Sequence, residues 1–138
     1  MEQATFSFKK YSVDNFSFDS ESIVDENISI KIDPTGKFIS KERSFLLKFE
    51  FYAFGKDLGI DKSFVTCTMN AEFVFSDNIK TVEDIPSYFY ANSIAIVFPY
   101  LRSFISSLTV QANIKPFILP TMNLSSLSVP LKEKIVVE

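Results

Sequence analysis

Residues 92–108, which read NSIAIVFPYLRSFISSL, are the stretch that decides the fold. If the stretch is helical, Arg102 and the three serines after it fall mainly on one side and the apolar residues on the other. The apolar side follows the i, i+3, i+4, i+7 spacing of an amphipathic helix and consists of Ile94, Val97, Phe98, Leu101, Phe104, Ile105 and Leu108. The spacing therefore predicts a helix with a wide apolar face, which needs a large apolar surface to cover.

Two polar or rigid residues predict how this helix begins and bends. Asn92 suits the N-cap position, because its side-chain oxygen can accept a hydrogen bond from a free amide of the first turn. Pro99 lacks a backbone donor and its ring crowds the preceding turn of a helix. The sequence therefore predicts a helix that is kinked near Phe98, or one whose regular part begins near Pro99.

The surface that this helix covers is predicted in the first half of the chain. Four segments alternate apolar and polar residues as half-buried strands do, at 5–19, 27–32, 43–54 and 63–75. In the first segment the apolar residues switch twice between even and odd positions, which indicates bulges or a bend. A turn is expected at 33–36, because Pro34 fixes φ and Gly36 can adopt a positive φ.

The second half of the chain adds short elements around the long helix. Asp84 and Pro86 are suited to the start of a short helix, and a second short helix is expected from 123–127. Residues 135–137 are expected to add to a sheet edge or to a partner. The order of elements predicts a single α+β domain over residues 1–138, with a four-stranded antiparallel sheet covered by one long helix and a short C-terminal helix.

Composition excludes several classes of function. The chain has 138 residues, a net charge of −3 and no histidine. Its basic residues are scattered, whereas nucleic-acid binding needs a clustered basic surface. Without histidine, imidazole ligation of a metal is excluded, and Cys67 as the single cysteine cannot build a thiolate metal site alone. No phosphate-binding loop or nucleophile motif is present, so we expect a protein that is not an enzyme and carries no cofactor or metal.

The N-terminal residues lack the basic and apolar regions of a signal peptide, and no run approaches the roughly 18 apolar residues of a membrane span. We therefore expect a soluble, cytoplasmic protein without membrane insertion. The chain contains 16 phenylalanines. Most of them are expected in the core, and a surplus of apolar surface would form a groove or an interface.

Several segments resemble the SecB family of protein-export chaperones. Residues 97–103 (VFPYLRS) are similar to the family's L-F-P-Y-A-R-E motif, and 105–106 match the Ile-Ser step that follows it. Residues 118–124 (ILPTMNL) resemble its L-A-P-x-N-F signature. Weaker similarities lie at 15–19 and 65–69, which resemble the family's D-I-S-F-E and F-L-C-E-V segments.

The resemblance implies a function as well as a fold. SecB-like proteins are dimers of dimers that hold unfolded polypeptide without ATP and, in protein export, pass it to the translocase motor SecA. The family's groove lies between the sheet, the loop after the long helix and the second helix. By position, this places substrate binding at Phe117, Ile118, Leu119, Met122, Leu124 and Leu127.

The family docks SecA on an acidic sheet face. Asp19 retains one such acid as a candidate partner-docking residue, whereas Asn15 and Thr68 are neutral where the family carries acids. SecA is therefore a weaker expectation than the fold. Three hypotheses remain open: a general holdase, an adaptor for one partner such as a toxin–antitoxin pair, and a binder of small apolar ligands in a cavity between sheet and helix.

Two expectations concern exposed apolar residues. We expect a homotetramer built through the long helix, because its apolar face is too wide for one contact, with an interface at Phe98, Leu101, Ile105 and Leu108. Residues 117–119 lie between Pro116 and Pro120, which favour extended backbone. Neighbours in an extended segment point in opposite directions, so Phe117 and Leu119 should share one side and Ile118 the other.

Overall fold

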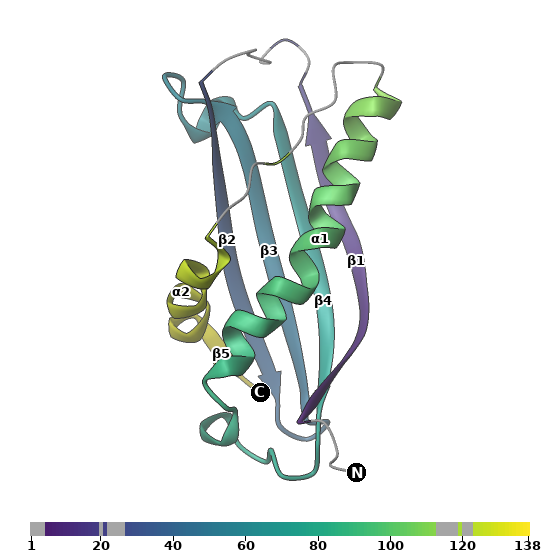
Figure 1. Ribbon diagram of the computed structural model, residues 1–138, viewed down its shortest axis with the longest axis vertical. Coiled ribbons are helices and arrows are strands. Elements are labelled where there is room, and N and C mark those ends of the chain that lie inside the picture. The colour runs from purple at the N-terminus through teal and green to yellow at the C-terminus, as the bar shows by residue number, and fades with distance from the viewer. Residues whose placement is uncertain (1–4, 20, 22–26, 113–118, 120–122) are drawn as a thin grey trace.

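The computed structural model describes residues 5–19, 21, 27–112, 119 and 123–138. Five strands and two α-helices lie in the order β1 (Phe6–Phe18), β2 (Ile28–Ile39), β3 (Ser44–Gly55), β4 (Val65–Phe75), α1 (Tyr88–Gln111), α2 (Ser128–Glu133) and β5 (Ile135–Val137). Three short 3₁₀-helices join them, η2 (Ile60–Lys62), η3 (Val82–Asp84) and η4 (Leu124–Leu127). The strands form one sheet, and both α-helices lie on the same face of it, α1 crossing it diagonally (Figure 1).

The sheet has the strand order β1-β4-β3-β2-β5 and is mixed. Three of its pairings are antiparallel, and β5 joins β2 in parallel at Gly36–Phe38. The prediction of four antiparallel strands was therefore incomplete, because it left residues 135–137 open between an edge and a partner. The structure confirms that these residues add a strand to a sheet edge. Three β-branched residues in succession favour strand structure.

The two parity changes predicted for the first strand are confirmed as irregularities in its pairing with β4. The register shifts once between Phe8 and Lys10 and again between Val13 and Asn15. Each extra residue reverses which side chains face the helix layer. As a result Phe8, Tyr11 and Phe16 all reach α1 or its neighbours from the same strand.

The predicted turn at 33–36 is wrong, because β2 runs straight through it and pairs with β3 over its whole length. Gly36 N donates to Lys134 O and Glu138 N donates to Phe38 O, so even-numbered residues of β2 turn their backbone groups toward β5. Pro34 has the same parity and lies before the start of β5. Its missing N–H therefore faces the outer edge, where proline costs no ladder hydrogen bond.

Gly36 has a packing role and not the turn role expected for it. A Cβ atom added there would lie 2.9 Å from Phe45 Cε1, closer still to Cζ of the same ring, and 3.2 Å from Leu131 Cδ1. Both side chains are fully buried. The absence of a side chain at this position lets α2 and the core phenylalanine approach the strand.

The long helix begins earlier than expected. It starts at Tyr88 and not after Asn92. In place of the short helix predicted from Asp84 and Pro86, the structure has the 3₁₀-helix η3, which ends at Asp84. Phe89 and Tyr90 are buried, so packing against the sheet extends the helix by a turn, as tertiary contacts often do. Pro99 lies inside this single helix.

Helix α1 also has the length and apolar composition of a membrane span, a test that the core helix of a soluble protein passes equally. Here it packs on the sheet, with Ile94, Val97 and Leu101 at most 1% exposed. The core between helix and sheet is rich in phenylalanine, as predicted, and Phe89 is central to it. Its ring lies 4.8–5.5 Å from the rings of Phe6, Phe45, Phe73 and Phe75.

Candidate functional site

The expected substrate groove falls where η4 and α2 meet α1. Among the residues predicted for it, Leu119 is buried, and Leu124 and Leu127 are half-buried against the core. Phe117, Ile118 and Met122 lie outside the described residues. Because Leu119 is buried, its side chain is not exposed to a client chain, contrary to its predicted role in substrate binding.

Serine side chains hold the short helices of this region together. Ser126 Oγ donates to Asn123 O at 2.8 Å, and Ser128 Oγ donates to Ser125 O at 2.7 Å. Each of these carbonyls also accepts the backbone N–H of the same serine, so the hydroxyl adds a second hydrogen bond to a turn that the backbone already closes. The serines therefore fix the backbone, while the apolar side chains between them remain available for contact.

Val129, on the α2 turn that follows, is a further exposed apolar residue of this region, and it was not among the residues predicted from the sequence. It is 60% exposed on α2, directly after the half-buried Leu127 and Ser128. Its neighbour Pro130 is half-buried, which marks this turn of α2 as one that presents apolar atoms to solvent. We define the apolar junction as Leu124, Leu127 and Val129.

The structure places the expected oligomer interface differently from the sequence analysis. Phe98, Leu101 and Ile105 are 5%, 0% and 0% exposed, because they pack on the chain's own sheet. Leu108 is half-buried. One sheet is thus wide enough to cover the apolar face of α1, and a second copy can contact only the outward side of that helix.

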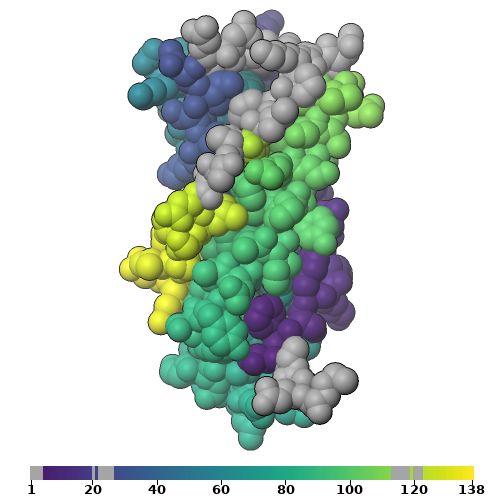
Figure 2. Space-filling view, in the orientation of Figure 1, coloured from purple at the N-terminus to yellow at the C-terminus, as the bar shows by residue number. Residues whose placement is uncertain are grey.

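The outward side of α1 carries an aromatic row that it shares with β1, and Figure 2 shows these two elements lying side by side. The rings of Tyr11 and Tyr100 stack at 4.5 Å, and those of Phe16 and Phe104 meet at 5.3 Å. Tyr11, Phe16 and Tyr100 are 44%, 52% and 39% exposed. We define the aromatic row as Phe8, Tyr11, Phe16, Tyr100 and Phe104.

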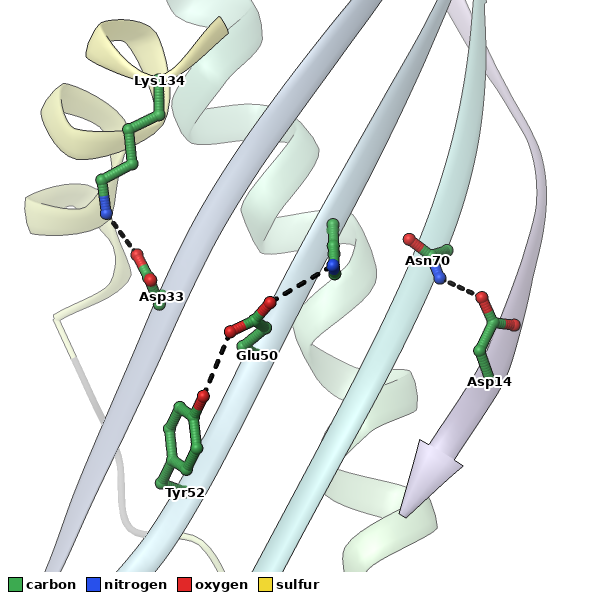
Figure 3. Close-up of polar contacts among 7 residues, drawn as sticks. Asp14, Asp33, Glu50, Tyr52, Asn70 and Lys134 are labelled. Carbon is green, nitrogen blue, oxygen red and sulfur yellow. Dashed lines mark hydrogen bonds and ion pairs between the residues drawn. The ribbon is translucent and has the colours of Figure 1, made fainter. Parts of the chain in front are cut away.

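The face of the sheet opposite the helices carries polar side chains. In Figure 3, the Asp33 carboxylate pairs with Lys134, and the Asp14 carboxylate accepts a hydrogen bond from Asn70. Glu50 lies 3.2 Å from Lys48 Nζ and accepts a hydrogen bond from the Tyr52 hydroxyl at 3.1 Å. Asp33 and Glu50 are therefore paired with lysines, whereas Asp14 is held by a neutral amide, and the face is not purely acidic.

Asp19, the predicted docking residue, lies just beyond β1 and is exposed. Its carboxylate accepts a hydrogen bond from the backbone N–H of Glu21 at 3.0 Å. This acid is thus part of a local turn at the end of the strand. Asn15 and Thr68, which the sequence analysis noted as neutral, are paired neighbours in the β1–β4 ladder.

Titration and metal binding add no catalytic feature to the part of the chain that the structure describes. Burial raises the pKa of the Cys67 thiol to about 11, which suits a small buried apolar residue. Burial, and then the hydrogen bond to Glu50, raise the pKa of Tyr52. The described residues contain no group of three or more metal-binding side chains.

The chain was compared with family models, with known sequences and with solved structures. No family model matches it. A related sequence, the uncharacterized protein MJ0357 of Methanocaldococcus jannaschii, is 25% identical over 130 residues, which cover 91% of this chain and 84% of that protein.

Among solved structures, the chain is similar to the SecB-like chaperone Rv1957 of Mycobacterium tuberculosis, solved in complex with a ChAD peptide from the antitoxin Rv1956 HigA1. The TM-score is 0.69 at 12% identity, with 86% of this chain and 88% of that chain covered. The SecB-like fold implied by the resemblance at 97–124 is therefore confirmed.

Proposed function

We propose that this protein is a holdase chaperone, which binds segments of unfolded polypeptide without ATP at the apolar junction beside α1. The observation that carries the proposal is a partly exposed apolar surface, on Leu124, Leu127 and Val129, within a SecB-like fold. The sequence-predicted residues Phe117, Ile118 and Met122 complete the proposed groove. No catalytic role forms part of this proposal.

The physics of such a site favours many weak contacts over one strong contact. Burying a large apolar side chain contributes about 1.5–3 kcal/mol, and ordering a flexible segment offsets much of that gain. A few half-buried leucines therefore bind several sequences with moderate affinity. This selectivity suits a protein that must bind a client and release it without an energy source.

The test is a titration of one labelled unfolded protein against single-site variants. Val129→Asp should weaken binding at least tenfold, or about 1.4 kcal/mol, because it places a charge on the apolar junction. Since Val129 is 60% exposed, its replacement should change the free energy of unfolding by no more than about 0.5 kcal/mol. Leu127→Asp is a second variant, checked for folding by thermal melting.

The matched control is Leu58→Asp, which introduces the same charge at an apolar residue that is 51% exposed outside the junction. It should bind the unfolded protein as the parent does. If Val129→Asp and every folded Leu127→Asp sample also bind like the parent, the site lies elsewhere and the proposal is wrong.

A dedicated adaptor is the second candidate, because the similar Mycobacterium tuberculosis chaperone was solved with a peptide from an antitoxin. Suppression of aggregation separates the candidates. A general holdase, as used in protein export, protects several unrelated unfolded proteins, an adaptor protects one, and a binder of small apolar ligands protects none. The proposal does not include docking on SecA, because Asp33 and Glu50 on this face are paired with lysines.

We further propose a cytoplasmic homo-oligomer, a tetramer, that assembles through the aromatic row. Phe16 and Tyr100 of the row are 52% and 39% exposed, and exposed apolar patches of this kind mark interaction surfaces. Light scattering should give a mass several times 15.7 kDa, and Phe16→Asp should lower it. A parent mass near 15.7 kDa would exclude the assembly.

A further inference from the structure

A second apolar site lies at the β5 edge of the sheet, where that strand passes the beginning of α1 (Figure 1). A cavity of about 460 Å³ opens there, within the size range of pockets that take small ligands or large side chains. Its lining combines five apolar or aromatic residues with two charged ones: Val82, Ile85, Tyr90, Ile135, Val137, Glu83 and Lys132.

The backbone of β5 presents free hydrogen-bonding groups beside this cavity. Lys134 O accepts from Gly36 N, and Glu138 exchanges hydrogen bonds with Phe38 and Ser40, so even-numbered residues turn toward β2. Backbone groups alternate along a strand, so those of Ile135 and Val137 point to the outer edge. The described residues provide no strand on that side.

The side chains of the same two residues, Ile135 and Val137, line the cavity. Val136 points to the other face and is 61% exposed. A strand added at this edge would therefore place every second side chain over the cavity. Open backbone groups and a side-chain pocket, side by side, are the two requirements for binding an extended peptide by strand addition.

The charges of the lining favour a peptide with charges of its own. Lys132 Nζ lies 5.9 Å from the centroid of the Tyr90 ring. Neither Lys132 nor Glu83 has an ion-pair partner among the described residues. An apolar side chain flanked by one acidic and one basic residue complements both charges.

We propose that the outer edge of β5 binds an extended peptide of a partner protein, which places one bulky apolar side chain in the cavity and an acidic residue at Lys132. A second copy of this chain fits less well. Its own β5 offers only Ile135, Val136 and Val137, and the carboxylate that follows, Glu138, is already paired with Lys37. The site is separate from the apolar junction, so the inference goes beyond the proposed holdase function.

The test uses the peptide acetyl-Thr-Glu-Val-Phe-Val-Lys-Thr-amide and its counterpart with Glu and Lys exchanged. Two orders are needed because an added strand can run in either direction. Binding is followed by amide hydrogen exchange of the intact protein in nuclear magnetic resonance. The amides of Ile135 and Val137 should exchange at least tenfold more slowly with one of the two peptides, since a bound strand would accept hydrogen bonds from them.

Protein and peptide variants separate the parts of the site. Val137→Pro removes one outward donor and should weaken binding at least tenfold, as should alanine in place of the peptide's phenylalanine. Lys132→Glu should weaken binding of the preferred peptide by a similar factor. Lys62→Glu, the same charge reversal at an exposed residue of η2, should leave it unchanged, and thermal melting checks the fold of each variant.

Three results would overturn the proposal. The first is no protection of Ile135 and Val137 by either peptide. The second is binding that survives Val137→Pro but fails in Val129→Asp, which would place the peptide at the apolar junction and leave the holdase proposal intact. The third is a fall in oligomeric mass on Val137→Pro, which would assign the edge to a second copy. If a peptide slows exchange at Ile135 and Val137 while Val129→Asp leaves the affinity for unfolded protein unchanged, the holdase proposal alone is rejected.

Discussion

The two edges of the sheet are secured by different means. At one edge, β1 pairs only with β4 and is tied to α1 by the aromatic row, in which Tyr11 and Tyr100 stack at 4.5 Å. At the other edge, β2 is packed closely under α2 at Gly36 and is joined by β5 with ion pairs. Both edge strands have an unpaired outer side, but the first edge exposes aromatic rings beside it, whereas the second has a side-chain pocket beside it.

That difference favours different kinds of partner for the two edges. Exposed rings bind through apolar area, which favours another large apolar surface such as a second copy of the chain. Open backbone groups bind through directional hydrogen bonds, which favour an extended segment. Four changes test how firmly each edge is held, in order of decreasing expected effect.

The largest effect concerns Cys67, which lies opposite Phe16 in the β1–β4 ladder and is 3% exposed. Burial raises the thiol pKa from 9.0 to about 11, so at pH 8 the thiolate, which is the reactive form, is roughly 100-fold scarcer than in the unfolded chain. Modification by a thiol reagent should therefore be at least about 100-fold slower in the native protein than in urea.

Removing the ring of Phe16 should raise the modification rate of native Cys67 several-fold, since it loosens the edge that covers the thiol. Phe54→Ala, which removes a half-buried ring from β3, is the control and should change the rate less. Equal rates for native and urea-unfolded protein would show that the β1 edge opens freely.

The next effect is expected at the other edge. Gly36→Ala forces a methyl group against the ring of Phe45, which is fully buried and has little room to move. Overpacking of this kind costs about 1–3 kcal/mol of unfolding free energy, measured by urea denaturation. Thr35→Ala, on the neighbouring position and opposite face, should cost less than about 1 kcal/mol; equal losses would contradict the close-packing role of Gly36.

A smaller effect is expected for the aromatic row. A double-mutant cycle of Tyr11→Ala and Tyr100→Ala should give a coupling free energy of about 0.5–1.5 kcal/mol, the range for stacked aromatic pairs. The same cycle with Tyr11 and Tyr88, which is 50% exposed and has no ring contact with Tyr11 among the described pairs, should give a value near zero. Coupling of equal size in both cycles would mean that the stack does not hold β1.

The smallest effect concerns the ion pair between Lys37 and Glu138, whose side chains are 43% and 60% exposed. Exposed pairs contribute about 0.2–1 kcal/mol, and salt screens them. A cycle of Lys37→Ala and Glu138→Ala in low salt should fall in that range and shrink in 1 M salt. A coupling that is independent of salt would show that packing, and not charge, joins β5 to β2.

Much of this architecture could be predicted from the sequence because local patterns carry it. The alternation at 43–54 and 63–75 identified the two central strands, and the parity changes around Phe8 and Val13 identified the bulges. The periodicity of 94–108 identified the apolar face of α1, and its residues Ile94 and Val97 are buried as expected.

The errors arose where contacts distant in sequence override a local signal. Pro34 and Gly36 together predicted a turn, but both lie within β2. Pro34 is tolerated there because it faces the open edge, and Gly36 is needed because the core leaves no room for a side chain. Asn92 read as a cap, yet burial of Phe89 and Tyr90 extends the helix past it. The width of the apolar face of α1 suggested two contacts, but one sheet covers Phe98, Leu101 and Ile105.

The candidate site was less predictable than the fold. Leu124 and Leu127 were inferred through the family resemblance, and Val129 was not, because exposure of one apolar residue leaves no periodic signal in the sequence. The aromatic row joins residues nearly 90 positions apart, such as Tyr11 and Tyr100. Only the three-dimensional crossing of α1 over β1 brings them together.

Pro34 has a consequence for solubility. Under the proposed holdase function, unfolded chains would lie near a sheet edge that could template their aggregation. Beside the start of β5, the outer side of β2 carries a residue without an N–H group, and the ion pair of Asp33 and Lys134 flanks it. A strand added at that point would meet a missing donor and a charge, which hinders extension of the sheet along this part of the β2 edge.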